Sequence, residues 1–231
     1  MHAVVIAAGE GRRLRPFTER WPKPILPIDG RPVLATLLRA LAEEGLGPVT
    51  LVTGHLAHEV ERLVGDGSAF GIELRIAHQQ RPSGSADAVA RAFDAGAAPP
   101  LVIVAADTVF RRGDLRRFAD EFRGSAAPGA LAVRRQPPPG PGRPAVRVVA
   151  GRVLRVVDDD PTNSLGSAPL WALDSPLEPY FDRLPGPPFE LSVVYQRAVD
   201  DGLTIAAVEV GATRDLTYPL DLVKENVLYL S

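Results

Sequence analysis

Two glycines and several basic residues lie close together near the start of the sequence. Gly9 and Gly11 follow a short apolar stretch, and four cations come soon after them: Arg12, Arg13, Arg15 and Lys23. Glycine allows backbone N–H groups to approach a phosphate closely, and arginine and lysine bind phosphate oxygens through charge-assisted hydrogen bonds. The segment therefore predicts a clamp for several phosphates, with a solvated basic loop as the alternative interpretation.

This segment differs from the two common phosphate-binding motifs. It contains no Gly-Lys-Ser or Gly-Lys-Thr sequence, which excludes a Walker loop, and GEGRRL lacks the third glycine of the dinucleotide fingerprint. Because glycines after a strand are most often structural, the cations carry the prediction. Prolines interleaved with these cations stiffen the backbone: Pro16, Pro22, Pro24 and Pro27.

A carboxylate ends another apolar stretch, LVIVAAD, at Asp107. Mg²⁺ is commonly held by one or two carboxylates together with substrate phosphates, and the end of a central strand is a suitable place for such a ligand. Asp107 is therefore a candidate magnesium ligand. A helix cap or a turn is the structural alternative.

The elements that must position these residues alternate between strand and helix in the first half. Short β-branched apolar runs predict strands, and apolar residues at helical spacing predict helices. With short loops this alternation indicates parallel βαβ units, in which ligands bind outside the carboxyl ends of the strands. The expected strands are residues 4–8, 49–53, 73–77 and 101–106, and the expected helices are residues 32–44, 58–64 and 85–93.

The second half is less regular, and no internal repeat is visible. The stretch QPPPGPGRP, residues 136–144, is expected to be a surface loop because its prolines and glycines exclude regular structure. The pattern suggests one sheet with an appended layer. The expected elements are helices at residues 115–122, 191–200 and 220–230, strands at residues 130–134 and 203–208, and a hairpin of residues 146–149 and 152–157.

Composition excludes several classes of protein. The 231 residues contain no cysteine, which rules out disulfides, thiolate metal sites and a cysteine nucleophile. A net charge of −2 gives no global field for nucleic acid or an acidic membrane, so neither is an expected partner. No apolar run is long enough for a signal peptide or a membrane span, and a cytoplasmic location is expected.

The opening segment resembles the signature of the sugar-1-phosphate nucleotidyltransferases, also called nucleotide-sugar pyrophosphorylases. The matching residues are Gly9, Gly11, Arg13, Leu14, Pro16, Thr18 and the run Pro22-Lys23-Pro24. The resemblance implies a three-layer α/β/α, Rossmann-like fold with a mixed, mainly parallel sheet. It also implies a single domain over residues 1–231, with a nucleotide-binding half at about 1–110 and a sugar-phosphate half at about 111–231.

Three further segments match the same family in order. Residues 79–89 resemble its base-binding segment, which implies that Gln79 bonds the edge of the base and that Gly84 and Ser85 pack against it. Asp107 falls on the first metal-binding aspartate. The closing segment ATRDLTYPLDL places Asp215 on the second, while Asp221 would cap or brace the terminal helix.

The sugar pocket departs from the family pattern. The stretch Asp159-Asp160-Pro161 stands where the family has Glu-Lys-Pro, so Asp160 replaces a lysine expected to face the sugar phosphate. Asp159 and Glu190 remain as implied substrate ligands. A substitute cation, a shifted alignment or an unusual acceptor would each account for the change. The candidate cations are Arg143, Arg147 and Arg155.

The resemblance implies transfer of a nucleotide monophosphate from an NTP to a sugar 1-phosphate, with Mg²⁺ as cofactor. Arg13 would hold the departing pyrophosphate and Lys23 would bridge the α-phosphate and the sugar phosphate. Asp107 and Asp215 would hold the metal. The implied nucleotide-binding residues are Ala8, Gly9, Gly11, Arg12, Gln79, Gly84 and Ser85.

Other interpretations stay open from the sequence. The altered pocket also fits a nucleotide-binding regulatory protein that has lost transfer, or transfer to another acceptor such as phosphocholine, a heptose phosphate or a muramic-type sugar phosphate. Gln79 can bond more than one base, so the NTP is UTP, dTTP, GTP or CTP. The chain is expected to be a monomer or a homo-oligomer.

Overall fold

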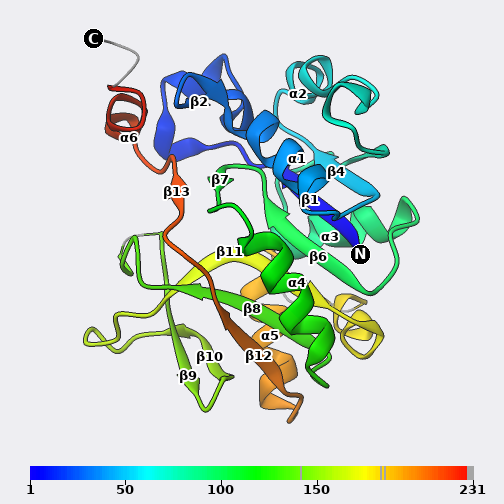
Figure 1. The fold of residues 1–231 in the computed structure, drawn as a ribbon, viewed down its shortest axis with the longest axis vertical. Helices are drawn as coiled ribbons and strands as arrows, with labels where there is room; N and C mark the ends of the chain where they lie inside the picture. The colour runs from blue at the N-terminus through cyan, green and yellow to red at the C-terminus, as the bar shows by residue number, and fades with distance from the viewer. Residues whose placement is uncertain (141, 183, 185, 228–231) are drawn as a thin grey trace.

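The computed structural model describes residues 1–140, 142–182, 184 and 186–227. A mixed sheet in the order β5-β4-β1-β6-β11-β8-β12-β10-β9 forms the centre of the described chain (Figure 1). Its strands are β1 (His2–Ala7), β4 (Val49–Thr53), β5 (Leu74–His78), β6 (Leu101–Ala105), β8 (Gly129–Arg134), β9 (Ala145–Val149), β10 (Arg152–Asp158), β11 (Gly166–Leu173) and β12 (Ile205–Glu209). Two small ribbons pair β2 (Pro27–Ile28) with β3 (Arg31–Pro32) and β7 (Thr108–Val109) with β13 (Arg214–Asp215).

Helices flank this sheet. The α-helices are α1 (Val33–Glu43), α2 (Ala57–Val64), α3 (Ser85–Asp94), α4 (Asp114–Gly124), α5 (Leu191–Asp200) and α6 (Pro219–Lys224). Short 3₁₀ helices are η1 (Arg12–Leu14), η2 (Phe17–Glu19), η3 (Lys23–Ile25), η4 (Ser68–Phe70) and η5 (Ser175–Phe181). In the part of the chain that the structure describes, none of the helices has the length and apolar character to cross a bilayer.

Neighbouring strands β5, β4, β1 and β6 are parallel, as the βαβ pattern predicts. β11 is antiparallel to both β6 and β8, which makes the sheet mixed. Because the four parallel strands end at one edge, the loops after them lie side by side there. That edge therefore gathers the glycine loop, Asp107 and the segment that begins at Gln79.

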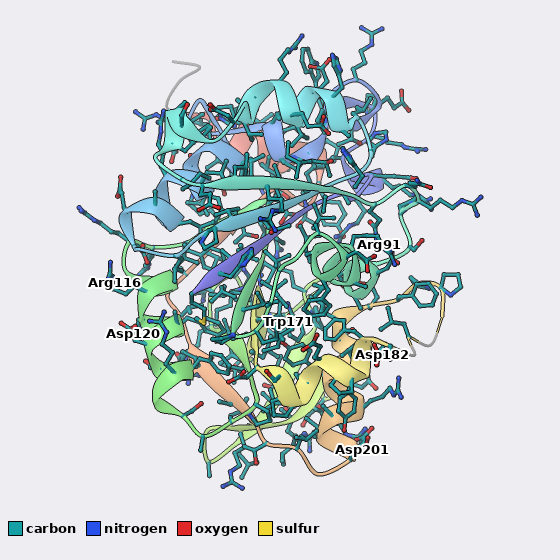
Figure 2. The ribbon with its side chains drawn as sticks, turned by 90° about the vertical axis from the view of Figure 1, so that its right-hand side faces the viewer. Arg91, Arg116, Asp120, Trp171, Asp182 and Asp201 are labelled. Carbon is teal, nitrogen blue, oxygen red and sulfur yellow. The ribbon has the colours of Figure 1, made fainter. Side chains whose placement is uncertain are left out.

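Alternate residues of the strands feed two separate cores. Val5 belongs to a cluster of buried side chains that includes residues of α1, α2 and α4. Val4, its neighbour, belongs to a second cluster with residues of α3 and α5. Figure 2 shows Trp171 of β11 inside the molecule, while Arg116 and Asp120 of α4 point outward. Side chains in a strand point to opposite faces in turn, so both faces of the sheet are covered.

Most of the predicted elements are present. β4 and α5 have the predicted bounds, and α1 buries the predicted leucine face. Two predictions fail. β11 was not expected, because Gly166, Ser167 and Pro169 interrupt its apolar pattern. The terminal helix ends at Lys224, since the Asn226 side chain bonds the carbonyl oxygens of Leu222 and Pro27; residues 228–230 of the prediction lie outside the described chain.

The C-terminal segment returns to the first half of the molecule. β13 pairs with β7 so that Asp215 lies opposite Thr108, directly beside Asp107. Arg214 donates to both carboxylate oxygens of Asp29 in the β2–β3 turn and to Glu225 after α6. Figure 1 shows α6 beside the β2 segment. Two residues far apart in the sequence, Asp107 and Asp215, thereby come together.

Candidate active site

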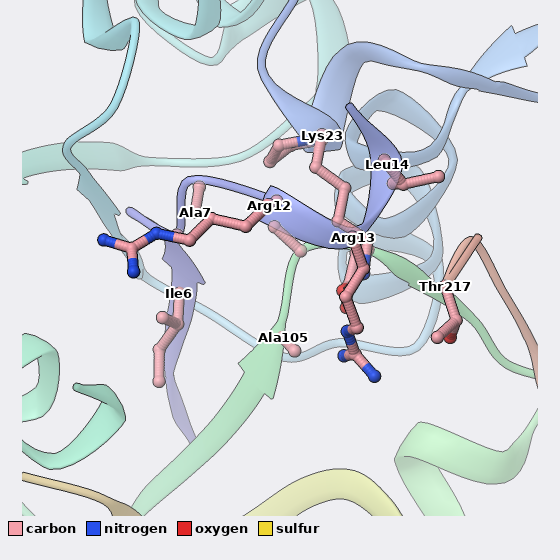
Figure 3. Close-up of a pocket in the computed structure, with 13 residues that line it drawn as sticks. Ile6, Ala7, Arg12, Arg13, Leu14, Lys23, Ala105 and Thr217 are labelled. Atoms are coloured by element: carbon pink, nitrogen blue, oxygen red, sulfur yellow. The ribbon is translucent and has the colours of Figure 1, made fainter. Parts of the chain in front are cut away.

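Two adjoining cavities open at the carboxyl edge of the parallel strands. The first has a volume of about 320 Å³ and is lined by the glycine loop, Lys23 and the end of β6 (Figure 3). The second has a volume of about 160 Å³. Both cavities are lined by Arg13, Lys23, Asp107 and Thr217, so they form one continuous site. The smaller cavity is further lined by Arg134, Arg143 and Asp215.

Lys23 and Asp107 face each other across this site. The Lys23 Nζ atom donates to Oδ2 of Asp107 in a close ion pair, with side-chain exposures of 16% and 25%. Pro22 holds extended backbone in front of η3, whose first residue is Lys23. The prolines therefore fix the direction from which the lysine enters the cavity, as the sequence predicts.

Asp215 accepts hydrogen bonds from two neighbours. Arg143 donates from Nη2 to Oδ1 at 2.7 Å and from Nε to Oδ2 at 3.3 Å, and the Thr217 hydroxyl donates to Oδ1 at 2.7 Å. Burial opposes ionisation of this carboxyl, but the bonds from Arg143 and Thr217 outweigh it and lower the pKa of Asp215. Asp215 is therefore an anion with 10% of its side chain exposed.

Arg134 ends β8 with only 3% of its surface exposed. One Nη atom donates to the Thr213 hydroxyl and the other lies 3.5 Å from Asp215 Oδ2. Its Nε has no hydrogen-bond partner among the described residues. Desolvation by burial lowers the pKa of this guanidinium, with the nearby Arg143 charge adding to the effect and Asp215 opposing it.

The glycine loop is folded by its own short contacts. Gly11 has a φ of 62°, and a Cβ there would lie 2.8 Å from a Thr18 methyl group, so the position favours glycine. Thr18 Oγ1 donates to the Gly11 carbonyl oxygen at 2.9 Å, and His55 Nε2 lies 2.9 Å from the Thr18 carbonyl oxygen, to which it must donate. A Cβ on Gly9 would meet nothing within 4 Å, because this glycine faces open space.

The two adjacent arginines of this loop have different surroundings. Arg13 extends across the site to Gly142, and its guanidinium carbon lies 5.9 Å from the centre of the Tyr218 ring. Arg12 points away from Arg13 in Figure 3 and donates to Glu10 at 2.6 Å. Arg12 lines the larger cavity only. Ala8 is buried and lines neither cavity, so its part in nucleotide binding stays a prediction.

Gln79 follows β5 and lies outside both cavities. Its side-chain amide donates to the Gly84 carbonyl oxygen at 2.9 Å and to Asp87 at 2.8 Å. Since both amide protons are used, the Gln79 carbonyl oxygen is left as an acceptor. β4 separates β5 from β1, and two strand spacings put Gln79 about 10 Å from the glycine loop in the sheet direction.

Gly84 and Ser85 make a structural junction with Glu190. The Ser85 hydroxyl donates to Glu190 Oε2 at 2.5 Å and accepts the Leu191 N–H at 2.9 Å, which joins the starts of α3 and α5. Gly84 has a φ of 113°, and a Cβ there would lie 2.3 Å from the Phe189 carbonyl oxygen. The prediction that this segment starts the next helix is confirmed. Contact of these residues with a base or a sugar stays a prediction.

A third cavity of about 510 Å³ lies beyond Arg143, between the proline-rich loop and residues 157–164. Asp159 and Asp160 line it, as does Asp158. Asp160 accepts the Thr162 N–H and hydroxyl at 2.9 and 2.6 Å and lies 3.4 Å from Arg147, so it shapes a turn. The wall predicted to contact the sugar is therefore acidic.

Asp107 and Asp215 fit a magnesium ion as a pair of hard oxygen donors at one cavity. Within the described ranges no group of three or more His, Cys, Asp and Glu residues is gathered for a metal. An ion held here would therefore take its remaining ligands from substrate phosphates and water. The role predicted for Asp221 is confirmed, since its carboxylate accepts the N–H groups of Thr217 and Tyr218 and caps α6.

Sequence reasoning missed part of this site. Arg134, Thr217 and Gly142 were not singled out, and Arg143 was only a candidate within a loop expected to be peripheral. Arg134 carried a usable signal, because a charged residue ending the buried strand GALAVR must lie at an edge where ligands bind. The proline-rich loop carried none, since its path to Asp215 depends on tertiary contacts.

The site therefore brings cations and two carboxylates together at the carboxyl edge of the parallel strands of an α/β domain. The family model described as nucleotidyl transferase matches residues 2–140, and the chain belongs to that family. The chain is 26% identical over its full length to a low-salt glycan biosynthesis nucleotidyltransferase of Haloferax volcanii, of which it covers 66%. It is 32% identical to a mannose-1-phosphate guanylyltransferase of Mycobacterium tuberculosis, over 71% of this chain and 46% of the relative.

Solved structures share the fold over nearly the whole chain. The inositol-1-phosphate CTP transferase of T. maritima matches with a TM-score of 0.83 and 18% identity, covering 95% of this chain and 90% of that one. A UDP-glucose pyrophosphorylase of Acinetobacter matches with a TM-score of 0.78 and 18% identity, covering 99% and 92%. Three of the curated relatives are longer than this chain, and the matches cover 66%, 25% and 39% of their length.

Proposed function

We propose that the protein is a sugar-1-phosphate nucleotidyltransferase, which converts an NTP and a sugar 1-phosphate into an NDP-sugar and pyrophosphate. One observation carries the proposal: Arg13, Lys23, Asp107 and Asp215, from separate parts of the sequence, line one cavity of about 160 Å³. A core or surface role would not require two cations and two carboxylates to converge there. The proposal includes the three-layer arrangement, supported by one core cluster on each face of the sheet.

In the proposed reaction an oxygen of the sugar phosphate attacks the α-phosphorus of the NTP. The bond to the β-phosphate oxygen breaks, and pyrophosphate leaves with that electron pair. A phosphate monoester has its second pKa near 6, so at pH 7 the nucleophile is mostly a dianion and needs no general base. This agrees with the two cavities, where cations and carboxylates but no histidine stand among the described lining residues.

The protein's contribution is then alignment and neutralisation of charge. The backbone N–H groups around Gly9 and Gly11 would bind the triphosphate in the cavity of about 320 Å³. Arg13, whose guanidinium spans the site, would hold the pyrophosphate as it departs. Lys23 would contact the α-phosphate, because its ammonium lies where the two cavities join.

Asp107 and Asp215 would hold Mg²⁺. When bound, the ion supplies positive charge that screens the phosphates from one another and from the carboxylates. Both carboxylates are paired with protein cations in the described structure, Asp107 with Lys23 and Asp215 with Arg143. With both carboxylates holding a metal, Lys23 and Arg143 would be free to bind the substrate phosphates.

Gln79 would select the base. With both amide protons committed to Gly84 and Asp87, its carbonyl oxygen can accept an N–H from the base. Uracil, thymine and guanine each carry a ring N–H on the pairing edge, whereas the ring nitrogen of cytosine at that edge is an acceptor. Of the four expected nucleotides this favours UTP, dTTP and GTP over CTP.

The test is pyrophosphate release with Mg²⁺ over a grid of five NTPs against sugar 1-phosphates, including hexose, heptose and muramic-type compounds, and phosphocholine. Asp107→Asn is the control, since it keeps the size of the side chain and removes its charge. Release in one combination, lost in Asp107→Asn with an unchanged melting temperature, is the expected result. Release that Asp107→Asn retains would remove Asp107 from the metal site, and silence over the whole grid would contradict the proposal.

A further inference from the structure

The small cavity beside Asp215 carries more positive charge than its carboxylates can neutralise. Four cations line it, Arg13, Lys23, Arg134 and Arg143, against two carboxylates, Asp107 and Asp215. The excess of two positive charges equals the charge of a phosphate monoester at neutral pH. Because bringing like charges together in a partly buried space is unfavourable, the arrangement is typical of an anion-binding site.

Arg134 is the strongest indication of such an anion. Only 3% of its side chain is exposed, and it lines the cavity. Nε is without a hydrogen-bond partner in the part of the chain that the structure describes. Because Nε itself is closed off from the cavity, an anion there would meet the rest of the guanidinium, of which one Nη atom lies 3.5 Å from Asp215 Oδ2.

Arg143 connects this cavity to the larger one of about 510 Å³ beyond it. It is the sole cation among the described residues that line the larger cavity, whose other charged residues are Asp158, Asp159 and Asp160. Its Nη2 and Nε atoms donate to Asp215. Arg143 can therefore turn from a carboxylate to a phosphate without leaving the cavity.

The other two candidate cations on this side are placed differently. Arg147 is about half exposed and bonds Asp158 and Asp160, so its charge is already matched. Arg155 is exposed on β10 and lines none of these cavities. This leaves Arg134 and Arg143 to perform the role of the lysine that the sequence lacks at Asp160.

We infer that Arg134 and Arg143 bind the phosphate of the acceptor, which is a phosphate monoester. The organic part of the acceptor would lie in the cavity of about 510 Å³. The inference rests on the proposed function, in which that phosphate is the nucleophile. It assigns two residues outside the motifs that carry the family resemblance. It also explains how an acidic turn at residues 158–160 can border the substrate: the turn lies beside the uncharged organic part, while the arginines hold the phosphate.

The test uses inorganic phosphate as the probe for the acceptor. It is titrated calorimetrically into the full chain saturated with Mg²⁺ and the α,β-methylene analogue of whichever NTP raises the melting temperature most. The analogue fills the triphosphate region, so phosphate reports the remaining anion site. The variants are Arg143→Gln, Arg134→Lys and, as a matched exposed arginine, Arg155→Gln.

We expect Arg143→Gln to weaken phosphate binding at least tenfold, which corresponds to about 1.4 kcal/mol. Arg134→Lys keeps the charge but loses the planar fork, and we expect a loss of about three- to tenfold. Arg155→Gln should change nothing, and the affinity for the NTP analogue should stay within about threefold in all three variants. Arg143 is partly exposed, so Arg143→Gln gives a clear answer even if the buried Arg134 variant fails to fold.

Two results would overturn the inference: phosphate that does not bind the nucleotide-loaded chain, or phosphate affinity that Arg143→Gln leaves within twofold of the wild-type value. Selective binding of phosphate without pyrophosphate release in the substrate grid would instead contradict the proposed transfer reaction and leave the anion site standing. The two failures are therefore distinguishable.

Discussion

Arg143 and Asp215, which lie 72 residues apart in the chain, form a two-point ion pair in which Nη2 and Nε face the two carboxylate oxygens at 2.7 and 3.3 Å. Lys23 pairs with Asp107 a short distance away in the same cavity. Each proposed metal ligand is thus held by a cation that the proposed reaction also needs. Removal of one member of a pair changes the charge available to the substrate, and the predictions below depend on this coupling.

Lys23→Ala should lower kcat about 10²- to 10³-fold, because a fixed charge at the reacting phosphate acts mainly on the transition state. The sequence contains one other lysine, the exposed Lys224, so Lys224→Ala is a matched control that should leave kcat unchanged. Steady-state pyrophosphate release measures both variants. An unchanged kcat in Lys23→Ala would exclude Lys23 from the site.

The same two lysines allow a spectroscopic check of the exchange of ion pairs. After reductive ¹³C-methylation, Lys23, Lys224 and the N-terminal amine should give separate NMR signals. Addition of Mg²⁺ and an NTP should shift the Lys23 signal, because Lys23 leaves Asp107 for a phosphate, and should leave the Lys224 signal in place. Equal shifts for both lysines would argue against the exchange.

Asp215→Asn should make stability less dependent on pH in the acid range. The pKa of Asp215 is lowered from its usual value of 3.8, so its ionised form stabilises the fold above that pH, and this contribution is lost as pH falls through the folded-state pKa. The difference in free energy of unfolding between wild type and Asp215→Asn should be constant from pH 7 to about 5 and shrink below 3.8. Urea titrations at several pH values measure it; a difference that grows on acidification would contradict the assignment.

Two glycine variants should separate binding from folding. Gly9→Ala should fold normally, since a Cβ there meets nothing within 4 Å, but should weaken NTP binding at least tenfold by blocking close approach of a phosphate. Gly84→Ala should destabilise the protein by at least about 2 kcal/mol, because the residue has a positive φ and its Cβ would clash with Phe189. Melting temperatures and nucleotide titrations test both. Normal NTP affinity in Gly9→Ala would move the triphosphate away from this loop.

Asp160→Lys should leave kcat/KM for the acceptor unchanged or raise it. The substitution restores the cation expected from the family pattern and removes one carboxylate from the cavity of about 510 Å³. It also removes the hydrogen bonds that Asp160 accepts from Thr162 in the turn. A collapse of kcat/KM, with an unchanged melting temperature, would show that Asp160 itself contacts the acceptor.

The sequence predicted the parallel half of the sheet well, because β1, β4 and β6 are short β-branched runs that admit few other structures. It predicted Asp107 as a site residue because this residue comes shortly after the end of β6, whereas it predicted Lys23 as one of the cations that follow the glycine loop. It did not predict β11, in which Gly166, Ser167 and Pro169 hide the alternation. Nor could it predict that the proline-rich loop delivers Arg143, because that depends on a contact between segments 72 residues apart.

The return of the C-terminal segment has a consequence for how the protein becomes active during synthesis. Asp215 and Thr217 complete a cavity whose other walls come from earlier in the chain, between Arg13 and Pro169. Arg214 and Asn226 fasten this closing segment to the turn at Asp29 and Gly30. A nascent chain can form its parallel strands early but lacks one carboxylate of the site until residues 214–226 have left the ribosome. Under the proposed function, a chain interrupted before residue 214 would therefore lack one of the two proposed metal ligands and would not turn substrates over.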